Sequence, residues 1–178
     1  GVEGMTMDRV AAAAGVAKGS LYRYFRGKRE LLEFVFTKVV DPIFQVFEEL
    51  SAKQCPAIEF LSEHLKALLE HVAKHAQVHR LLFEDEAAHG LLQPSERRTA
   101  EVASRQLAGV FRQGMDEGVF RPQDPLMLAH MYLGITKGVL QSRPPLGEAE
   151  QRTNLHRLIM ETFLDGIAAD KGRVSVDP

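Results

Sequence analysis

The chain has 178 residues, 45% of them hydrophobic, and its 22 basic and 24 acidic side chains give a formal net charge of -2. That is enough apolar material for one sizeable core or for two smaller ones. The single cysteine, Cys55, excludes an internal disulfide, and no apolar run approaches the roughly 18 residues that a membrane span needs. We therefore expect a cytoplasmic globular protein without a membrane partner.

The N-terminal segment has the pattern of two short helices joined by a glycine turn. Thr6 is suited to cap a first helix, which should end at Gly15. A second helix begins near Ala17, and its Leu21 and Phe25 share one face that we expect to be buried. The opposite face carries Lys18, Ser20, Tyr22, Arg23 and Tyr24. Such side chains can hydrogen-bond phosphates and base edges, so this face is predicted to contact DNA.

The stretch AGVAKGSLYRYFRGKREL resembles the helix-turn-helix signature of the TetR family of bacterial transcriptional regulators, and the match extends from Gly4 to about Phe36. The resemblance implies DNA contacts from Thr6, Lys18, Gly19, Ser20, Tyr22, Tyr24 and Lys28. For Tyr22 the alternative is a partly buried packing role. Ala17 departs from the pattern, because a capping serine or threonine is common there. The family's first helix is absent from the sequence, so we expect a truncated chain or the remainder of a longer protein.

Helical periodicity continues along the rest of the chain and predicts an all-α fold. We expect a helix-turn-helix DNA-binding domain over residues 1–40, a helical ligand-binding and dimerisation domain over residues 41–170, and a tail over residues 171–178. The charge is divided in the same way, with seven basic against four acidic residues up to residue 40 and fifteen against twenty beyond it. A basic module on an acidic body suits binding to phosphates at one end of the molecule.

One apolar phase runs from Lys28 to Leu50 straight through Pro42. Either a single helix kinks at the proline or Asp41 caps a new helix; the unbroken phase favours the single helix. Further helices are predicted over residues 56–76, 78–88, 95–118, 125–142 and 148–170. The third of these should face inward with Val102, Ala103, Leu107, Val110, Phe111 and Met115. Gly90 and Pro94 are expected to interrupt the chain before it.

The last two predicted helices have features of a pairing surface. Gly134 and Gly138 give one helix a smooth strip, and the other carries an apolar stripe that continues to Ile167. One interpretation is that both helices face their own core. TetR proteins pair through a four-helix bundle, however, so the resemblance implies a homodimer. Its expected interface is Gly134, Gly138, Leu155, Leu158, Ile159, Thr162 and Phe163.

The resemblance also implies a cavity for a small effector within the C-terminal helices. The candidate lining residues are bulky: Phe44, Phe47, Phe60, His64, Leu68 and Phe83. They favour an apolar or aromatic effector, and the alternative is that each belongs to an ordinary core. His64, His71, His75 and His79 recur at a spacing that can hold a metal. A polar stripe beside an apolar one has the same spacing, so we expect no metal.

These patterns predict a ligand-responsive transcriptional regulator. By the family default it is a repressor, which binds a pseudo-palindromic operator as a homodimer and is released by a small molecule. No phosphate-binding glycine loop, nucleophile elbow or acid and base pair indicates an enzyme, and no cofactor is expected. The alternative is a helical interaction or structural module without DNA binding, which leaves the basic face between Lys18 and Lys28 unexplained.

Overall fold

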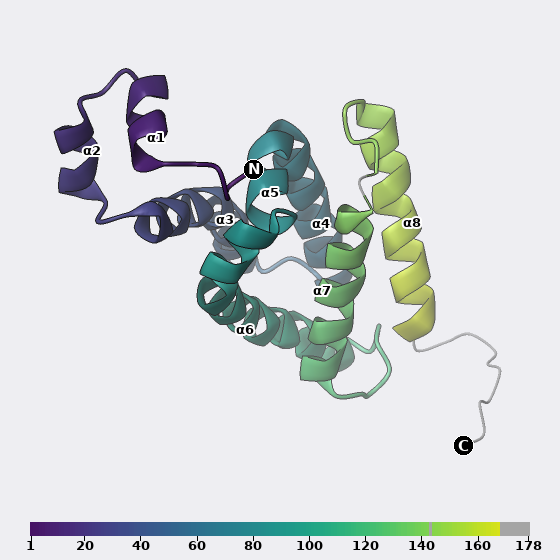
Figure 1. Ribbon diagram of the computed structural model, residues 1–178. Coiled ribbons are helices and arrows are strands. Elements are labelled where there is room, and N and C mark those ends of the chain that lie inside the picture. Colours follow the sequence, from purple (N-terminus) through teal and green to yellow (C-terminus); the bar gives the residue numbers. More distant parts are fainter. Residues whose placement is uncertain (143, 168–178) are drawn as a thin grey trace.

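The computed structural model describes residues 1–142 and 144–167 as a succession of eight helices (Figure 1). The helices are α1 Met7–Ala13, α2 Lys18–Tyr24, α3 Lys28–Lys53, α4 Ala57–Lys74, α5 Ala76–Phe83, α6 Glu86–Asp116, α7 Pro125–Gln141 and α8 Ala149–Ile167. Figure 1 shows α1 and α2 at one end of the molecule, with α7 and α8 side by side at the opposite end. The all-α fold is thus confirmed. The tail predicted over residues 171–178 and the last residues predicted for the final helix lie outside the described ranges.

Capping and a glycine turn determine the ends of the two N-terminal helices. The Thr6 side chain accepts a hydrogen bond from the Arg9 amide at 3.3 Å and caps α1. Gly15 turns the chain with φ of +66°, in the left-handed region that glycine adopts without a steric penalty. At Ala17 no side chain caps α2. The glycine turn and both cap assignments are therefore as predicted.

Helix α3 is a single helix across Pro42, as the unbroken apolar phase indicated. The proline removes one backbone donor, but buried residues lie on both sides of it: Leu32 and Phe36 before, Phe47 and Leu50 after. Burial at both ends therefore holds the helix together. The boundary predicted after residue 40 falls inside this helix, so the two expected domains share α3.

Two predicted boundaries in the middle of the chain are wrong. Helix α5 ends at Phe83, before the expected residue 88, and α6 begins at Glu86 and runs through Gly90 and Pro94. The Asp85 side chain accepts from the Ala88 amide at 3.1 Å and caps α6. Burial of side chains on the first two turns of α6 then outweighs the low helix propensity of glycine and proline.

The inward face of α6 also differs from the prediction at one position. Val102 is 45% exposed, whereas Ser104 is buried and donates its hydroxyl hydrogen to the Glu101 carbonyl at 3.1 Å. Leu107, Val110 and Phe111 point inward as expected. Once α6 is one helix from Glu86, its buried face is set by the whole helix rather than by the segment after Pro94.

The buried side chains form two apolar clusters. The larger one joins the end of α3 to α4, α6, α7 and α8, and aromatic rings pack at its centre, where Phe111 contacts both Tyr132 and Phe163. The smaller one, called the junction cluster below, consists of Val2, Leu32, Phe36, Leu82, Ala88 and Leu92. It joins the N-terminal segment and the first half of α3 to α5 and α6.

Asp85 strengthens this junction with hydrogen bonds. One carboxylate oxygen caps α6, and the other accepts from the Val2 amide at 2.9 Å. These backbone donors lower the pKa of Asp85, the Val2 amide having the largest effect. A carboxylate between α5 and α6 thus fixes a segment that is 83 residues away along the chain.

The Asp85→Asn substitution should therefore lower stability at neutral pH, because an amide oxygen accepts these bonds less strongly than a carboxylate. The folded-state pKa lies below the ordinary value of about 3.9, so the carboxylate's contribution is complete above that value and is lost as the pH falls through the folded-state pKa. Thermal melts of both proteins between pH 7 and pH 3 should show that the difference between their melting temperatures decreases toward the acidic end. A difference in melting temperature that stays constant or increases as the pH falls would contradict this role of Asp85.

Gly114 gives a second test of packing, in the large cluster. A Cβ at this position would lie 2.2 Å from the Phe120 ring and 3.0 Å from the Ala57 side chain. Gly114→Ala should therefore lower the free energy of unfolding by about 1–3 kcal/mol through overpacking. Gly109→Ala, on the same helix with nothing within 4 Å, is the control and should raise it by roughly 0.5–1 kcal/mol. Equal effects in urea denaturation would refute the packing argument.

Candidate nucleic-acid interface and ligand cavity

Helices α1 and α2 form a helix-turn-helix whose second helix is open to solvent. The Val16 amide donates to the Ala11 carbonyl at 3.0 Å and closes the turn after Gly15. No residue of α2 is buried, and Leu21 and Phe25, expected to be buried, are half-buried. The Phe25 ring lies 5.3 Å from that of Phe34, which is itself exposed. The apolar face of α2 is thus only partly covered by the described residues.

The opposite face of α2 presents the side chains that the sequence predicted for DNA contact. Tyr24 is 71% exposed and Tyr22 is 44% exposed, so both phenols are accessible to solvent. A Cβ on Gly19 would meet nothing within 4 Å, so the protein's own packing does not require glycine there. Ser20 is half-buried beside them. The face is therefore open to the close approach of a DNA backbone.

Lys18 is held by an ion pair in the absence of DNA. Its Nζ lies 2.7 Å from Asp8 Oδ2 and 5.8 Å from the centre of the Tyr22 ring. The hydrogen bond to Asp8 raises the pKa of Lys18. Both side chains are more than half exposed, and exposed pairs of this kind contribute little net energy. A phosphate can therefore take the place of Asp8 at small cost.

Lys28 lies at the start of α3, beside the positive end of the helix dipole. Its Nζ donates to the Glu3 carbonyl at 3.4 Å, so the ammonium is held near the N-terminal segment. Thr6 uses a hydroxyl lone pair for capping, and its O–H remains a donor. Arg26 has its side chain 94% exposed and adds a further cation next to α2.

Helices α3 to α7 enclose a mainly apolar cavity of about 260 Å³. Five of the six predicted lining residues border it: Phe44, Phe47, His64, Leu68 and Phe83. Phe60 does not, because its ring lies against Phe47 at 4.7 Å and borders a second cavity instead. Other lining residues were not predicted, among them Phe36, Gln106 and Lys137. A signal for Gln106 was its position three residues after Ala103 and four before Val110, within the inward stripe of α6.

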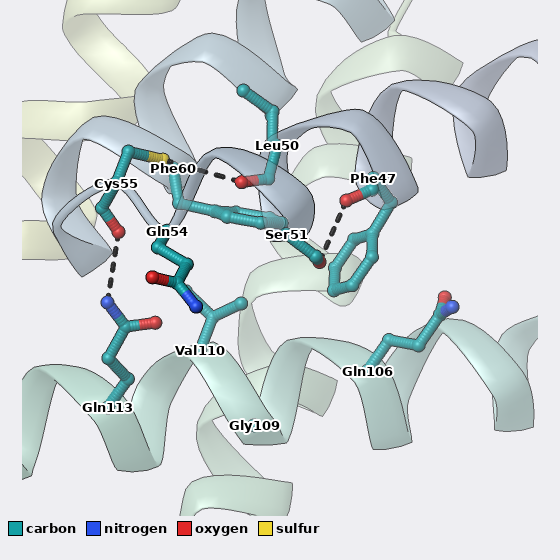
Figure 2. A pocket seen from close by; sticks show the side chains of 10 residues that line it. All are labelled: Phe47, Leu50, Ser51, Gln54, Cys55, Phe60, Gln106, Gly109, Val110 and Gln113. Carbon is teal, nitrogen blue, oxygen red and sulfur yellow. Dashed lines mark hydrogen bonds between the residues drawn. The ribbon is translucent and has the colours of Figure 1, made fainter.

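The second cavity, about 200 Å³, is more polar (Figure 2). Figure 2 shows the Gln113 amide donating to the Cys55 carbonyl, at 2.9 Å, and the Ser51 hydroxyl donating to the Phe47 carbonyl. These polar groups are therefore hydrogen-bonded to one another within the chain. Phe47 and Gln106 border both cavities, so they form part of the wall between them.

His64 is a buried, ionisable side chain that borders the large cavity. It is 6% exposed, and its ring contacts those of Phe47, Phe60 and Tyr132 at centroid distances of 5.9, 6.4 and 6.5 Å. Burial lowers the pKa of His64 to about 4, so the imidazole is neutral at pH 7. His71 and His79 also border the cavity, and burial is the main cause that lowers the pKa of each.

The four regularly spaced histidines do not converge. His71 and His75 have ring centroids 4.6 Å apart, while the His79 ring lies against Phe83 and His64 against other aromatics. Among the residues that the structure describes, no group of three or more His, Cys, Asp or Glu side chains is placed to hold a metal ion. No helix in the same residues is long and apolar enough to cross a bilayer.

The predicted pairing surface is divided between the core and the exterior. Ile159 and Phe163 are buried inside the chain, so they are not available to a partner, and Leu155 is half-buried. Gly134, Gly138, Leu158 and Thr162 are exposed. The structure adds exposed apolar residues on α7 that the sequence interpretation missed: Leu126, Met127, Met131 and Ile135.

The fold and these two sites define a class of protein: a helix-turn-helix DNA-binding regulator with a separate internal cavity. Comparisons with known proteins show what the chain is similar to. The model for "Bacterial regulatory proteins, tetR family" matches residues 1–35. The HTH-type transcriptional regulator YhgD of Bacillus subtilis (strain 168) is 27% identical over 152 residues, which cover 82% of this chain and 79% of that protein. The HTH-type transcriptional repressor KstR2 of Mycobacterium tuberculosis (strain ATCC 25618 / H37Rv) is 28% identical over 144 residues, covering 78% and 70%.

Solved structures agree on the fold. The ketosteroid transcriptional regulator KstR2 of Mycobacterium tuberculosis superimposes with a TM-score of 0.74 at 22% identity, covering 96% of this chain and 88% of that chain. The complex of SmeT, from Stenotrophomonas maltophilia, with triclosan gives 0.72 at 22% identity, covering 99% and 88%. Residues 1–35 thus match the helix-turn-helix region of the TetR family of transcriptional regulators, and the whole chain has the fold of these solved structures. The matched helix-turn-helix and the fold are those of transcriptional regulators.

Proposed function

We propose that this chain represses transcription in the cytoplasm as a homodimer, which binds a pseudo-palindromic operator and releases it when an apolar or aromatic molecule fills the large cavity. The observation that carries the proposal is the course of α3. This helix begins at Lys28, beside the exposed face of α2, and contributes Phe36, Phe44 and Phe47 to the cavity wall. One helix therefore touches both sites.

The DNA contacts are assigned to the exposed face of α2 and its surroundings. Lys18 and Ser20 near the start of α2 are proposed to contact bases or adjacent phosphates, with Gly19 allowing close approach. Tyr22 and Tyr24 are proposed to donate to phosphate oxygens, and Thr6 and Lys28 to form an anion site at the helix starts. Two recognition helices would then enter successive major grooves about 34–36 Å apart.

Cavity occupation is proposed to act through α3 and α5. Phe36 and Phe83 border the cavity, and their rings lie 5.7 Å apart at the edge of the junction cluster. A ligand that displaces either ring also displaces the cluster that fixes the N-terminal segment. The similarity to KstR2, a ketosteroid transcriptional regulator, and to SmeT, solved in complex with triclosan, supports a small apolar effector for this chain.

Selection from random duplex DNA should yield a pseudo-palindromic site, and Lys28→Ala should weaken binding to it and to unrelated DNA alike. Loss of one phosphate contact should reduce the slope of log K against log salt by about one. Lys18→Ala should change the preferred sequence if Lys18 contacts bases. Lys53→Ala, at the far end of α3, is the control. Unchanged affinity in both test variants would refute the assignment.

The dimer is proposed to form through the exposed faces of α7 and α8. Each large apolar side chain buried there contributes roughly 25 cal/mol per Å² of area removed from water. Met131→Glu should therefore give a monomer by light scattering at micromolar concentration, whereas wild type should have twice the 19.9 kDa chain mass. Ile58→Glu, on an exposed apolar residue of α4, should remain dimeric. A monomeric wild type would overturn this part of the proposal.

A further inference from the structure

The large cavity contains polar side chains whose hydrogen bonding is incomplete. His64 Nδ1 and Gln106 Oε1 are both buried and have no hydrogen-bond partner among the residues that the structure describes. Buried polar atoms are paired in the great majority of cases, and each unpaired one costs about 1–3 kcal/mol. The side chains that carry these two atoms border the same cavity, from α4 and α6.

These two side chains differ in chemistry from the apolar part of the cavity wall. Gln106 Oε1 can only accept a hydrogen bond, whereas a neutral imidazole nitrogen donates or accepts according to its tautomer. Many of their neighbours in the wall are aliphatic or aromatic, as Phe47, Leu68 and Leu107 illustrate. Among the polar neighbours, Thr136 donates to the Tyr132 carbonyl at 2.8 Å, and His71 Nε2 is a third buried atom without a hydrogen-bond partner among the described residues. A ligand that is wholly apolar would leave both atoms unpaired, and a ligand hydroxyl would pair with them.

The charge of the inner wall is also fixed. Burial keeps the imidazole of His64 uncharged at pH 7. The formal charges on the cavity wall belong to Lys137, which is exposed, and to Glu96, which lies 3.1 Å from His89. Because these opposite charges lie on the same cavity wall, a charged ligand of either sign would be attracted by one of them and repelled by the other. Burying an unpaired ligand charge would be costly.

We propose that the effector is an uncharged, mainly apolar molecule with at least one hydroxyl-type group, and that His64 and Gln106 select it by hydrogen bonding. This inference rests on the proposed function, because it assigns the chemistry of the same effector cavity. It narrows the effector from any apolar or aromatic compound to one with a neutral hydrogen-bonding group. It also makes two residues on different helices responsible for that selection.

Three probes with one ring system test the proposal: naphthalene, 2-naphthol and 2-naphthoate. Calorimetric titration of the full chain, without DNA, should show 2-naphthol binding at least about tenfold more tightly than naphthalene and than 2-naphthoate. Tenfold corresponds to about 1.4 kcal/mol, within the range of one buried hydrogen bond. Equal affinity for naphthalene and 2-naphthol, tight binding of the anion, or failure of all three to bind would overturn the proposal.

Two cavity variants identify the selecting residues. His64→Phe and Gln106→Leu should each reduce the preference for 2-naphthol, and the double variant should bind the two neutral probes within about twofold of each other. Val102→Ala, an apolar change at an exposed position of α6 that borders neither cavity, should leave the preference intact. If His64→Phe fails to fold by circular dichroism, Gln106→Leu alone still decides, because Gln106 is only half-buried. A preference that persists in Gln106→Leu and in every folded variant would remove these residues from the account.

A separate assay distinguishes failure of this inference from failure of the proposed function. Fluorescence anisotropy of the selected DNA site is measured with each probe at saturation. Binding of 2-naphthol with the expected preference but without release of DNA would contradict ligand-controlled repression and leave the cavity chemistry intact. Release of DNA by naphthalene and 2-naphthol at equal concentrations would support repression and contradict the selection by His64 and Gln106.

Discussion

Helix α3 takes part in both apolar clusters, and the arrangement of the whole molecule depends on it. Its first half contributes Leu32 and Phe36 to the junction cluster, and its second half contributes Phe47 and Leu50 to the large one. The helix continues across Pro42, so its two halves are joined without an intervening loop. The DNA-binding module and the cavity are thus connected by a continuous backbone rather than by a flexible linker.

The junction cluster adds a second connection, through α5. The short α5 helix packs Leu82 into the cluster while Phe83 borders the cavity, and Asp85 follows directly with its bond to the Val2 amide. Packing and hydrogen bonding therefore converge on the segment that precedes α1. A ligand can influence this segment without any contact to the helix-turn-helix, since it need only shift residues that belong to the cavity and the cluster together.

The sequence predicted features that short-range chemistry determines. Thr6 as a cap and the left-handed Gly15 follow from a few neighbouring residues. The course of α3 through Pro42 was predictable from the apolar phase that runs from Lys28 to Leu50. The beginning of α6 was not predictable in this way, because Gly90 and Pro94 indicate an interruption locally and only the burial of Leu92 in the tertiary structure outweighs it.

In the candidate sites, too, local sequence patterns do not determine which side chains line a cavity or a surface. Phe60 and His64 are one turn apart on α4, yet they border different cavities, and no local pattern separates them. The stripe on α8 likewise divides, with Phe163 in the core and Leu158 at the surface. Which side of a stripe faces inward depends on the position of the packed neighbours. The basic face of α2 was predictable because exposure there follows from its composition.

The central proposal, that filling the cavity moves the DNA-binding modules, is tested most directly by the distance between the two recognition helices of the proposed dimer. Spin labels would be placed on Arg23→Cys in a chain whose single native cysteine is replaced by Cys55→Ser. Pulsed electron resonance should give a separation compatible with the roughly 34–36 Å between successive major grooves when the protein is bound to DNA. With 2-naphthol bound and DNA absent, the account predicts a distance distribution whose centre moves away from that spacing. An unchanged distribution at a probe concentration that saturates the cavity would contradict it.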